Sequence, residues 1–309
     1  MTSVTVPPAL VESLQEFRGE DGRIWAARLP ALASELLDRW ELRPDGPAAH
    51  GVVGLVLPVR RADGTPAVLK LQPVDEETAG EPVALRAWGG RGAVRLLDHE
   101  PASGSMLLER LDASRSLLEV PDDLAALRVL AELLRELTQH QAPEELRKLK
   151  SVAEGLLDRA PAAGAALADA DERRLFADCA AALGEVRAEP GDRLLHWDLH
   201  YGNVLAPLPG GDREPWLVID PKPLSGHPGF ELLPALRNRW ADVLATGDPT
   251  RALRRRFDLL VEALELDREV AAAWTLGRVL QNAVWGAEEG QTALDPAQRA
   301  IAELLSGRN

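Results

Sequence analysis

The chain has 309 residues, with 35 lysine and arginine residues against 49 aspartate and glutamate residues, which gives a formal net charge of −14. This acidic balance argues against a general binder of nucleic acid or anionic membranes, since both would repel the protein, and leaves room for a small cationic ligand. A hydrophobic content of 46% excludes a disordered chain. Because one hydrophobic core rarely extends beyond roughly 250–300 residues, we expect one large lobe or two modest ones.

Cysteine usage and hydropathy limit the compartment. Cys179 is the only cysteine, so neither an intramolecular disulfide nor a cysteine-based zinc site can form. No apolar run reaches the roughly 18–20 residues that a membrane span needs, and residues 1–17 lack the basic start and apolar block of a secretory signal. We therefore expect a monomeric cytoplasmic protein that binds neither nucleic acid nor membrane.

The first 110 residues predict a β-rich lobe. Two runs rich in valine and leucine flank a short turn at Gly64, which is typical of a β-hairpin. Apolar residues at helical spacing precede the hairpin, and Pro30 should bend or divide that helix. Gly89 and Gly90 should end a second helix. The predicted elements are a helix at 21–40, strands at 51–61 and 65–72, a helix at 75–88, and strands at 94–100 and 105–111.

The remaining chain predicts a larger helical lobe with a polar hairpin inside it. Helical spacing of apolar residues runs from Pro121 to about Val186 and resumes after a short β-like island at 194–220, with breaks at 246–249 and at Gly286. We therefore expect an α+β fold of two lobes, with a ligand in the cleft between them. The expected division is an N-terminal lobe at 1–110, a hinge at about 109–115, and a C-terminal lobe at 116–309.

Residues 196–203 carry the strongest signal for function. His196, Asp198 and Asn203 follow the pattern H-x-D-x-x-x-x-N, the catalytic-loop pattern of phosphoryl-transfer enzymes. In that chemistry the aspartate orients the attacking hydroxyl and accepts its proton, and the asparagine five residues later holds Mg²⁺ against the phosphates. The alternative is a polar turn whose side chains satisfy their own backbone. Because the chain has only 6 histidines, a chance match is rare.

Two further residues extend this pattern. Asp220 ends the apolar run 216–219, where kinases place a second metal-binding aspartate; otherwise it is a turn residue. Lys70 ends a sequence that resembles V-A-I-K, whose lysine contacts the α- and β-phosphates; otherwise it is a solvated strand residue. Lys70 is the only lysine before Lys148 in a chain that mostly uses arginine, which favours a specific role.

Other candidates lie beside the predicted nucleotide. A glutamate from the following helix should position Lys70, and among Glu76, Glu77 and Glu81 we favour Glu81 because it lies in the helical apolar frame. Pro82 would then restart the helix. The remaining candidates on this side are Gly51 and Gly54, over the phosphates, and Glu109 and Leu111, at the lobe junction.

The C-terminal helices offer candidates for cation binding. Aromatic faces and carboxylates both attract cations, so Trp285 with Glu288 and Glu289 could line a cation site, although an exposed helix end has the same pattern. The three arginines at 254–256 predict a solvated helix face.

Taken together, these residues resemble the aminoglycoside phosphotransferases, which have a protein-kinase-like two-lobed fold. The closest likeness is to the group of streptomycin 6-phosphotransferases (streptidine kinases) and hydroxyurea phosphotransferases. The catalytic loop points to the superfamily, and the tryptophan-rich and C-terminal stretches point to this group. The stretches that carry the likeness are residues 85–90, 94–98, 106–112, 195–201, 213–216, 255–260 and 274–282.

The resemblance implies roles for the matching residues. Residues 226–231 stand where the family has G-D-P-x-x-D, with His227 and Glu231 in place of the two aspartates, and the second acid braces the catalytic loop. The implied substrate-binding residues are Glu231, Asn282, Trp285, Glu288 and Glu289. The implied catalytic residues are Asp198 as base, Asn203 and Asp220 as Mg²⁺ ligands, and Lys70 as phosphate anchor.

The resemblance also implies an ATP- and Mg²⁺-dependent kinase that inactivates a small cationic antibiotic, with the 6-hydroxyl of streptomycin as the favoured acceptor. One alternative is a kinase of the same fold that acts on hydroxyurea or a metabolite. A second alternative is a non-catalytic nucleotide-binding regulator. The sequence disfavours that regulator because Lys70, Asp198, Asn203 and Asp220 fill all four chemical positions.

Overall fold

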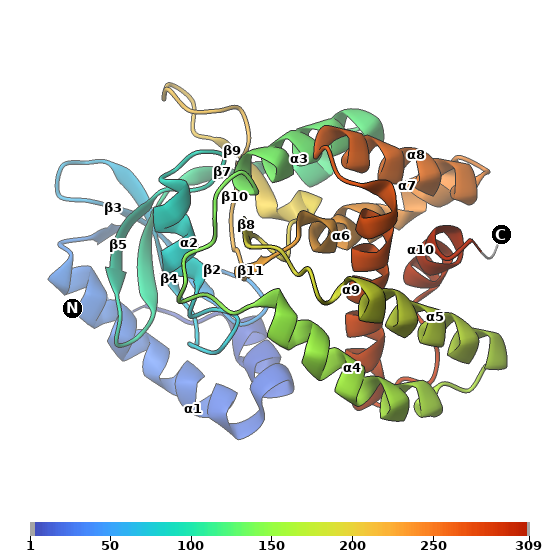
Figure 1. Ribbon diagram of the computed structural model, residues 1–309. Coiled ribbons are helices and arrows are strands. Elements are labelled where there is room, and N and C mark those ends of the chain that lie inside the picture. Colours follow the sequence, from blue (N-terminus) through green and yellow to red (C-terminus); the bar gives the residue numbers. More distant parts are fainter. Residues whose placement is uncertain (1–3, 308–309) are drawn as a thin grey trace.

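The computed structural model describes residues 4–307. An antiparallel sheet occupies the left of Figure 1, with the strand order β1-β3-β4-β6-β5 and β2 also paired with β3. The β3–β4 hairpin lies at its centre, and Gly64 takes a φ of +84° in the turn, a conformation that favours glycine. The strands are β1 (Arg43–Pro44), β2 (Ala49–His50), β3 (Leu55–Arg60), β4 (Pro66–Leu71), β5 (Leu96–Glu100) and β6 (Ser105–Glu109).

Helix α1 (Pro8–Arg39) packs along this sheet (Figure 1). Leu55, Leu57 and Val59 alternate along β3 and join α1 in one hydrophobic core, as the period of two in a strand requires. The helix begins earlier than the sequence predicts. It is divided at Gly19, which has a φ of +57°, whereas the residues around Pro30 keep helical dihedral angles. Of the expectation that Pro30 bends or divides the helix, the division was wrong. The break lies at Gly19 because glycine adopts a positive φ at little cost.

The second predicted helix is shorter than expected. Helix α2 (Glu81–Trp88) has Pro82 in its first turn and ends at Gly89, whose φ is +60°. The prediction that residues 75–80 are helical was wrong. The Asp75 carboxylate accepts backbone N–H groups of Glu77 and Thr78 at 2.9 Å each, which holds this segment in turns.

The larger part of the chain is helical, on the right of Figure 1. Its helices are α3 (Asp123–Leu137), α4 (Leu149–Ala166), α5 (Ala170–Val186), α6 (Leu232–Arg237), α7 (Trp240–Ala245), α8 (Pro249–Ala263), α9 (Arg268–Glu288) and α10 (Pro296–Leu305). Two small antiparallel sheets lie among them, in the orders β10-β9-β7 and β11-β8. Their strands are β7 (Leu111–Ser116), β8 (Arg193–Leu195), β9 (Val204–Pro207), β10 (Leu217–Val218) and β11 (Leu224–Gly226).

Two predictions for the C-terminal helices were wrong. Helix α9 continues through Gly286, and the chain turns instead at Gly290, where φ is +87°. The arginines at 254–256 do not all face solvent, because Arg256 is buried and forms an ion pair with Asp123 at 2.6 Å. The half-buried carboxylate partner decides this outcome, and it lies 133 positions away in the sequence.

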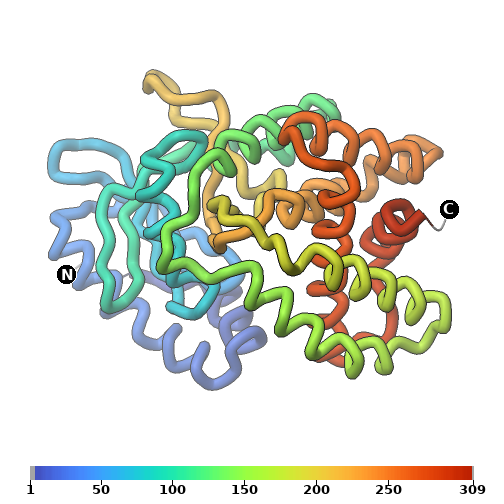
Figure 2. The backbone as a smooth tube through the Cα atoms, in the orientation of Figure 1, coloured from blue at the N-terminus to red at the C-terminus, as the bar shows by residue number. Residues whose placement is uncertain are grey.

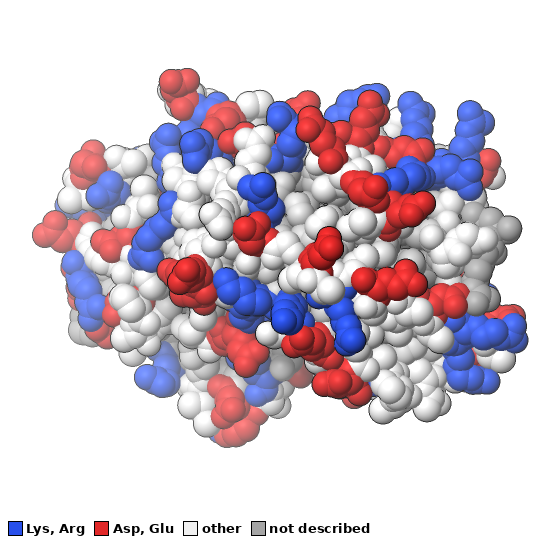
Figure 3. Space-filling model, viewed as in Figure 1, with Lys and Arg blue, Asp and Glu red and all other residues white. Residues whose placement is uncertain are grey.

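The expected α+β fold, with a small β-rich part before a larger helical part, is confirmed. Figure 2 shows the two ends of the chain at opposite sides of the molecule. No helix within residues 4–307 is long and apolar enough to cross a membrane. Acidic and basic side chains are interspersed on the face seen in Figure 3, so the negative charge is not gathered there. Leu85 and Trp88 of α2 pack in the same core as the C-terminal helices, and the division at residue 110 stays a prediction.

One side chain links the two parts of the chain. Arg213 lies in the loop between β9 and β10, which projects at the top of Figure 1. Its guanidinium donates to the carbonyl oxygens of Gly90 and Ala93 at 2.8 and 2.9 Å, and it forms an ion pair with Glu109 at 2.8 Å. The loop of the polar hairpin is thereby attached to the junction between the parts.

Candidate active site

The loop at residues 196–200 follows β8 directly, and His196 anchors its start. The buried His196 ring donates from Nε2 to the Ile219 carbonyl oxygen at 3.0 Å, while Nδ1 accepts the Asp198 backbone N–H at 3.3 Å. Burial lowers the pKa of His196 to about 4, so the ring is neutral at neutral pH. Its stack on Trp88, with ring centroids 6.2 Å apart, completes the anchor. The ring thus fixes the backbone that carries Asp198.

Two buried side chains, those of Glu231 and Arg278, hold the backbone of Trp197. Trp197 has a φ of +67°, which costs energy for a residue with a side chain. The Glu231 carboxylate accepts its N–H at 2.6 Å, and Arg278 donates to its carbonyl oxygen at 3.0 Å. The Arg278 guanidinium also lies 4.7 Å from the centre of the Trp197 ring. These contacts maintain a backbone conformation that turns the next residue, Asp198, towards the cavity described below.

Asp198 and Asn203 are tied together. The Asn203 amide nitrogen donates to the Asp198 carbonyl oxygen at 3.0 Å, which leaves the amide oxygen of Asn203 available for another partner. The Ile219 backbone N–H donates to the Asn203 carbonyl oxygen at 2.9 Å, so Asn203 and Asp220 lie at the same end of the β9–β10 hairpin. Lys222 adds a cation, with Nζ 3.3 Å from the Asp198 carboxylate.

Lys70 joins the two parts of the molecule at this end of the hairpin. Its ammonium donates to both Glu81 oxygens at 2.7 Å and also forms an ion pair with Asp220. Gln72 donates to Glu81 at 2.5 Å and holds the carboxylate in place. Lys70 lies on β4, Glu81 begins α2 and Asp220 follows β10, so one cluster connects the large sheet with the catalytic hairpin.

The charges in this cluster follow from burial and pairing. Burial alone would disfavour the Lys70 ammonium, but Asp220 and Glu81 outweigh it and raise the pKa of Lys70. The Lys70 charge lowers the pKa of Asp220, whereas burial raises the pKa of Glu81. Lys70 is therefore a fixed cation that keeps Asp220 ionised.

The residues at this point fit a magnesium ion that is shared with a phosphate chain. Asp220 supplies a carboxylate and Asn203 a free amide oxygen, and Mg²⁺ commonly binds proteins through one or two such ligands, with phosphates and water completing the octahedron. Within residues 4–307, no group of three or more histidine, cysteine, aspartate or glutamate side chains could hold a metal alone.

The other nucleotide-side candidates lie around the sheet. Gly51 and Gly54 form the tip of the β2–β3 hairpin, where the Gly51 N–H donates to the Gly54 carbonyl oxygen at 3.0 Å. A Cβ on Gly54 would lie 3.5 Å from the Leu71 carbonyl oxygen. One Glu109 carboxylate oxygen accepts from Arg213 and from the Arg95 N–H, while the Glu109 N–H donates to the Arg95 carbonyl oxygen at 3.0 Å. Leu111 begins β7.

Two cavities meet beside Asp198. The inner cavity, of about 460 Å³, is lined by Asp198, Lys222 and Arg278 together with residues of α9 and α10. The outer cavity, of about 860 Å³, lies between the loop before α2 and the start of α4. Glu77, Trp197 and Trp285 line both. The pair therefore forms one continuous cleft with the candidate base at its inner end, and both volumes suit small-molecule ligands.

The structure separates the substrate-side candidates. Trp285 lines both cavities, and Glu289 and Asn282 line the inner one, where the Asn282 amide donates to Gln298 at 2.9 Å. Glu288 lines neither cavity and pairs with Arg159 at 2.9 Å on the surface. Glu231 is fully buried behind Trp197, and burial raises its pKa to about 7.

Four site residues were missed by the sequence reasoning. Gln72 and Lys222 flank predicted residues, and the scarcity of lysine was a usable signal for Lys222. Arg278 lies in a helix without a motif, so only the fold reveals its contact with Trp197. Glu77 was considered only as a partner of Lys70 and instead lines the cleft.

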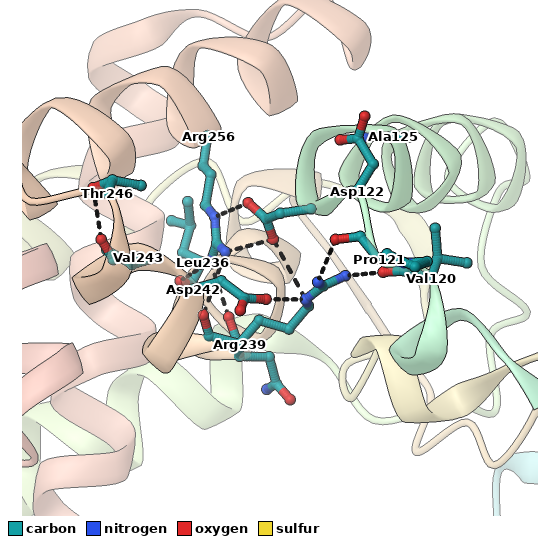
Figure 4. Close-up of polar contacts among 12 residues, drawn as sticks. Val120, Pro121, Asp122, Ala125, Leu236, Arg239, Asp242, Val243, Thr246 and Arg256 are labelled. Atoms are coloured by element: carbon teal, nitrogen blue, oxygen red, sulfur yellow. Dashed lines mark hydrogen bonds and ion pairs between the residues drawn. The ribbon is translucent and has the colours of Figure 1, made fainter.

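A second charged network lies behind the loop. Asp123, at the start of α3, forms ion pairs with Arg256 at 2.6 Å and with Arg239 at 3.6 Å. The two arginines converge in Figure 4. The Arg239 guanidinium also lies 5.7 Å from the centre of the Tyr201 ring. Since Tyr201 directly follows the loop, this network connects α3 and α8 to the residues that position Asn203.

Known proteins are similar to this chain over nearly its whole length. Residues 39–290 match the model of the aminoglycoside/hydroxyurea antibiotic resistance kinase family. The chain is 57% identical to a streptomycin 6-kinase of Streptomyces glaucescens, over 98% of both chains. It is also 57% identical to a hydroxyurea phosphotransferase of Kitasatospora aureofaciens, over 99% of this chain and 87% of the relative.

Solved structures share the fold at low identity. The aminoglycoside phosphotransferase APH(4)-Ia superposes with a TM-score of 0.59 at 16% identity, covering 89% of this chain and 98% of that one. A thermostable variant of that enzyme, in a ternary complex with ADP and hygromycin B, gives a TM-score of 0.57 at 16% identity, with the same coverage.

Proposed function

The chain belongs to the aminoglycoside/hydroxyurea antibiotic resistance kinase family and is a phosphotransferase, and on that premise we propose that it transfers the γ-phosphoryl group of ATP to the 6-hydroxyl of streptomycin. The single observation that carries the substrate is the 57% identity to a streptomycin 6-kinase over nearly the whole chain. The cleft supports it, since unpartnered carboxylates and the Trp285 face suit a ring with two guanidinium groups. Because the proposed reaction uses ATP as the phosphoryl donor, we expect it to take place in the cytoplasm.

Asp198 performs the proton transfer in this mechanism. Its carboxylate orients the substrate hydroxyl and accepts its proton as the oxygen bonds to the γ-phosphorus, while the bond from that phosphorus to the β,γ-bridging oxygen breaks and ADP leaves. Lys222, which is 3.3 Å from Asp198, lies where its ammonium can follow the negative charge onto the transferring phosphoryl oxygens.

The nucleotide is held at the opposite wall. Lys70, fixed by Glu81, binds the α- and β-phosphates, and the backbone at Gly51 and Gly54 covers the phosphate chain. Asn203 and Asp220 would hold Mg²⁺, which supplies charge neutralisation on the phosphates when bound. The adenine ring would use backbone groups at Glu109 and Leu111, in a hinge at 109–115 between lobes at 1–110 and 116–309.

Mass spectrometry tests the assignment. Purified protein with ATP, Mg²⁺ and streptomycin should yield streptomycin carrying one added phosphate, and fragmentation should place it on the streptidine ring. Protein without ATP is the control. An unmodified drug, alongside phosphorylation of another compound in the same assay, would overturn the assignment.

Hydroxyurea is the second candidate substrate, because a hydroxyurea phosphotransferase is as similar to this chain as the streptomycin kinase is. The volume of the cleft favours the larger molecule, since hydroxyurea would leave the outer cavity of about 860 Å³ without a ligand. A direct competition between both compounds, with kcat/KM measured for each, ranks them.

A further inference from the structure

Glu77 belongs to the nucleotide side of the molecule in sequence but to the substrate cleft in space. It lies between β4 and α2, and it lines both cavities beside Trp197 and Trp285. The loop that carries it is fixed, since the Asp75 carboxylate accepts the Glu77 N–H at 2.9 Å and pairs with Arg18 of α1. Glu77 is therefore presented to the cleft by a rigid support.

The Glu77 carboxylate has no hydrogen-bond or ion-pair partner in the described part of the chain, residues 4–307. Arg147 and Arg278 act on the Glu77 carboxylate electrostatically without forming an ion pair with it, and two buried Arg147 nitrogens have no hydrogen-bond partner within residues 4–307. Arg278 donates to the Trp197 carbonyl oxygen and to Gln281, and the Arg147 guanidinium lies 4.6 Å from the centre of the Trp197 ring. A half-buried carboxylate without a partner is costly, and a cationic ligand would offset that cost.

A second unpartnered carboxylate, Glu289, enters the inner cavity from the end of α9. Among the described residues 4–307, the inner cavity thus has one such carboxylate from each lobe. The other acidic residues of the inner cavity are occupied, because Asp198 faces Lys222 and Asp295 caps α10.

We propose that Glu77 is a substrate-binding residue supplied by the nucleotide lobe: it binds one guanidinium group of the antibiotic while Glu289 binds the other, so the substrate bridges the lobes. This inference rests on the proposed function. Guanidinium and carboxylate groups form paired, charge-assisted hydrogen bonds, which fixes the ring with one hydroxyl towards Asp198. A substrate that ties the lobes together favours the arrangement that also binds nucleotide, so each ligand strengthens the binding of the other.

Steady-state kinetics give the first test. Glu77→Gln should raise the KM for streptomycin about tenfold or more while kcat changes about twofold at most, since a charge-assisted contact made in both ground and transition state is lost. Glu77→Asp should give an intermediate KM. Glu144→Gln is the matched control, because Glu144 is an exposed carboxylate near the cleft that lines neither cavity, and its KM should equal that of wild type.

Calorimetry gives the second test. The Kd of ADP with Mg²⁺ is measured with and without saturating streptomycin. Wild type should bind ADP more tightly with the drug present, and Glu77→Gln should lose that difference. Glu289→Gln should bind the drug more weakly yet keep the difference at saturation, because Asp198 and Trp285 still line the cavity and hold the drug on the helical lobe. A loss of fold would show as a lower Tm and would not reproduce this pattern.

The outcomes separate the inference from the proposed function. Wild type that phosphorylates streptomycin, with Glu77→Gln equal to it in KM and in ADP coupling, overturns the inference and leaves the function standing. Equal loss of ADP coupling in Glu77→Gln and Glu289→Gln also overturns it. Wild type that neither binds nor phosphorylates streptomycin overturns the function, and the inference with it.

Discussion

The two walls of the cleft differ in how completely their charges are paired. On the nucleotide wall, Lys70 is held by Glu81 and Asp220, and Gln72 holds Glu81. On the substrate wall, Glu77 and Glu289 face the cleft without partners in the described residues 4–307. In the proposed mechanism the nucleotide wall is thus prepared before any ligand binds, whereas the substrate wall would be completed by the ligand. Prearranged groups suit a step that depends on positioning, and open carboxylates suit the recognition of a cation.

The largest expected effect is at the junction of the two walls. Asp198→Asn should lower kcat about 10³-fold, because the hydroxyl proton loses its acceptor. Nucleotide binding should survive, since Lys70, Glu81 and Asp220 are untouched. Single-turnover rates and the Kd of ADP measure the two properties separately. A variant that keeps wild-type turnover would contradict the role of Asp198.

Glu231, which holds the Trp197 backbone beside Asp198, should make the stability of the protein depend on pH. Burial raises its pKa from 4.5 to about 7, so between these values the folded protein holds a proton that the unfolded chain has lost. The stability from this carboxyl therefore falls as pH rises through that range. Glu231→Gln keeps an acceptor for the Trp197 N–H and removes this dependence.

The free energy of unfolding of Glu231→Gln, relative to wild type, should accordingly rise by about 3 kcal/mol from below pH 4.5 to above pH 7. Denaturant unfolding at several pH values measures it. Comparison with wild type is needed because His196, whose pKa is lowered to about 4, changes stability in the opposite direction and is present in both proteins. A flat difference between the two proteins would contradict the buried-carboxyl account.

Lys222 tests whether the substrate wall also contributes to chemistry. Lys222→Met should lower kcat about 10²-fold, the usual cost of removing one donor that stabilises transition-state charge. The Kd of ADP should stay near the wild-type value, because Lys222 pairs with Asp198 and not with the Lys70 cluster. Lys222→Arg should recover part of the rate. Loss of nucleotide binding in Lys222→Met would show instead that Lys222 binds the nucleotide.

The smallest expected effects are KM changes that show which glutamates of the substrate wall contact the drug. Glu289→Gln should raise the KM for streptomycin about tenfold, whereas Glu288→Gln should change it less than about twofold. Glu288 lines neither cavity and pairs with the exposed Arg159, and exposed ion pairs contribute little. Initial rates at varied drug concentration measure both. Equal KM changes in the two variants would show that Glu288 and Glu289 act on the drug only through long-range electrostatics.

The sequence allowed the fold class and the nucleotide wall to be predicted because that information is local. The catalytic-loop spacing places Asp198 and Asn203 five residues apart, and the helical frame of α2 singles out Glu81 over its neighbours. The hairpin of β3 and β4 likewise follows from alternating apolar residues and a glycine turn.

The substrate wall could not be predicted in the same way. Glu77 and Glu289 are 212 positions apart by their numbers, and only tertiary packing brings their segments to one cavity. Arg256 was misjudged for the same reason, since its partner Asp123 lies in another helix. Gly286 and Pro30 show that a helix-breaking residue type ends a helix only where the packing leaves the backbone free to turn.

Arg213 links the loop between β9 and β10 to the large sheet. Its bonds to the Gly90 and Ala93 carbonyl oxygens and to Glu109 tie the projecting loop at the top of Figure 1 to the junction, whereas the start of α4, which lines the outer cavity, lies lower in that view. The Arg213 contacts and the Lys70–Asp220 ion pair therefore tie the large sheet to the catalytic hairpin at two separate points, so the hairpin is held in register with the sheet.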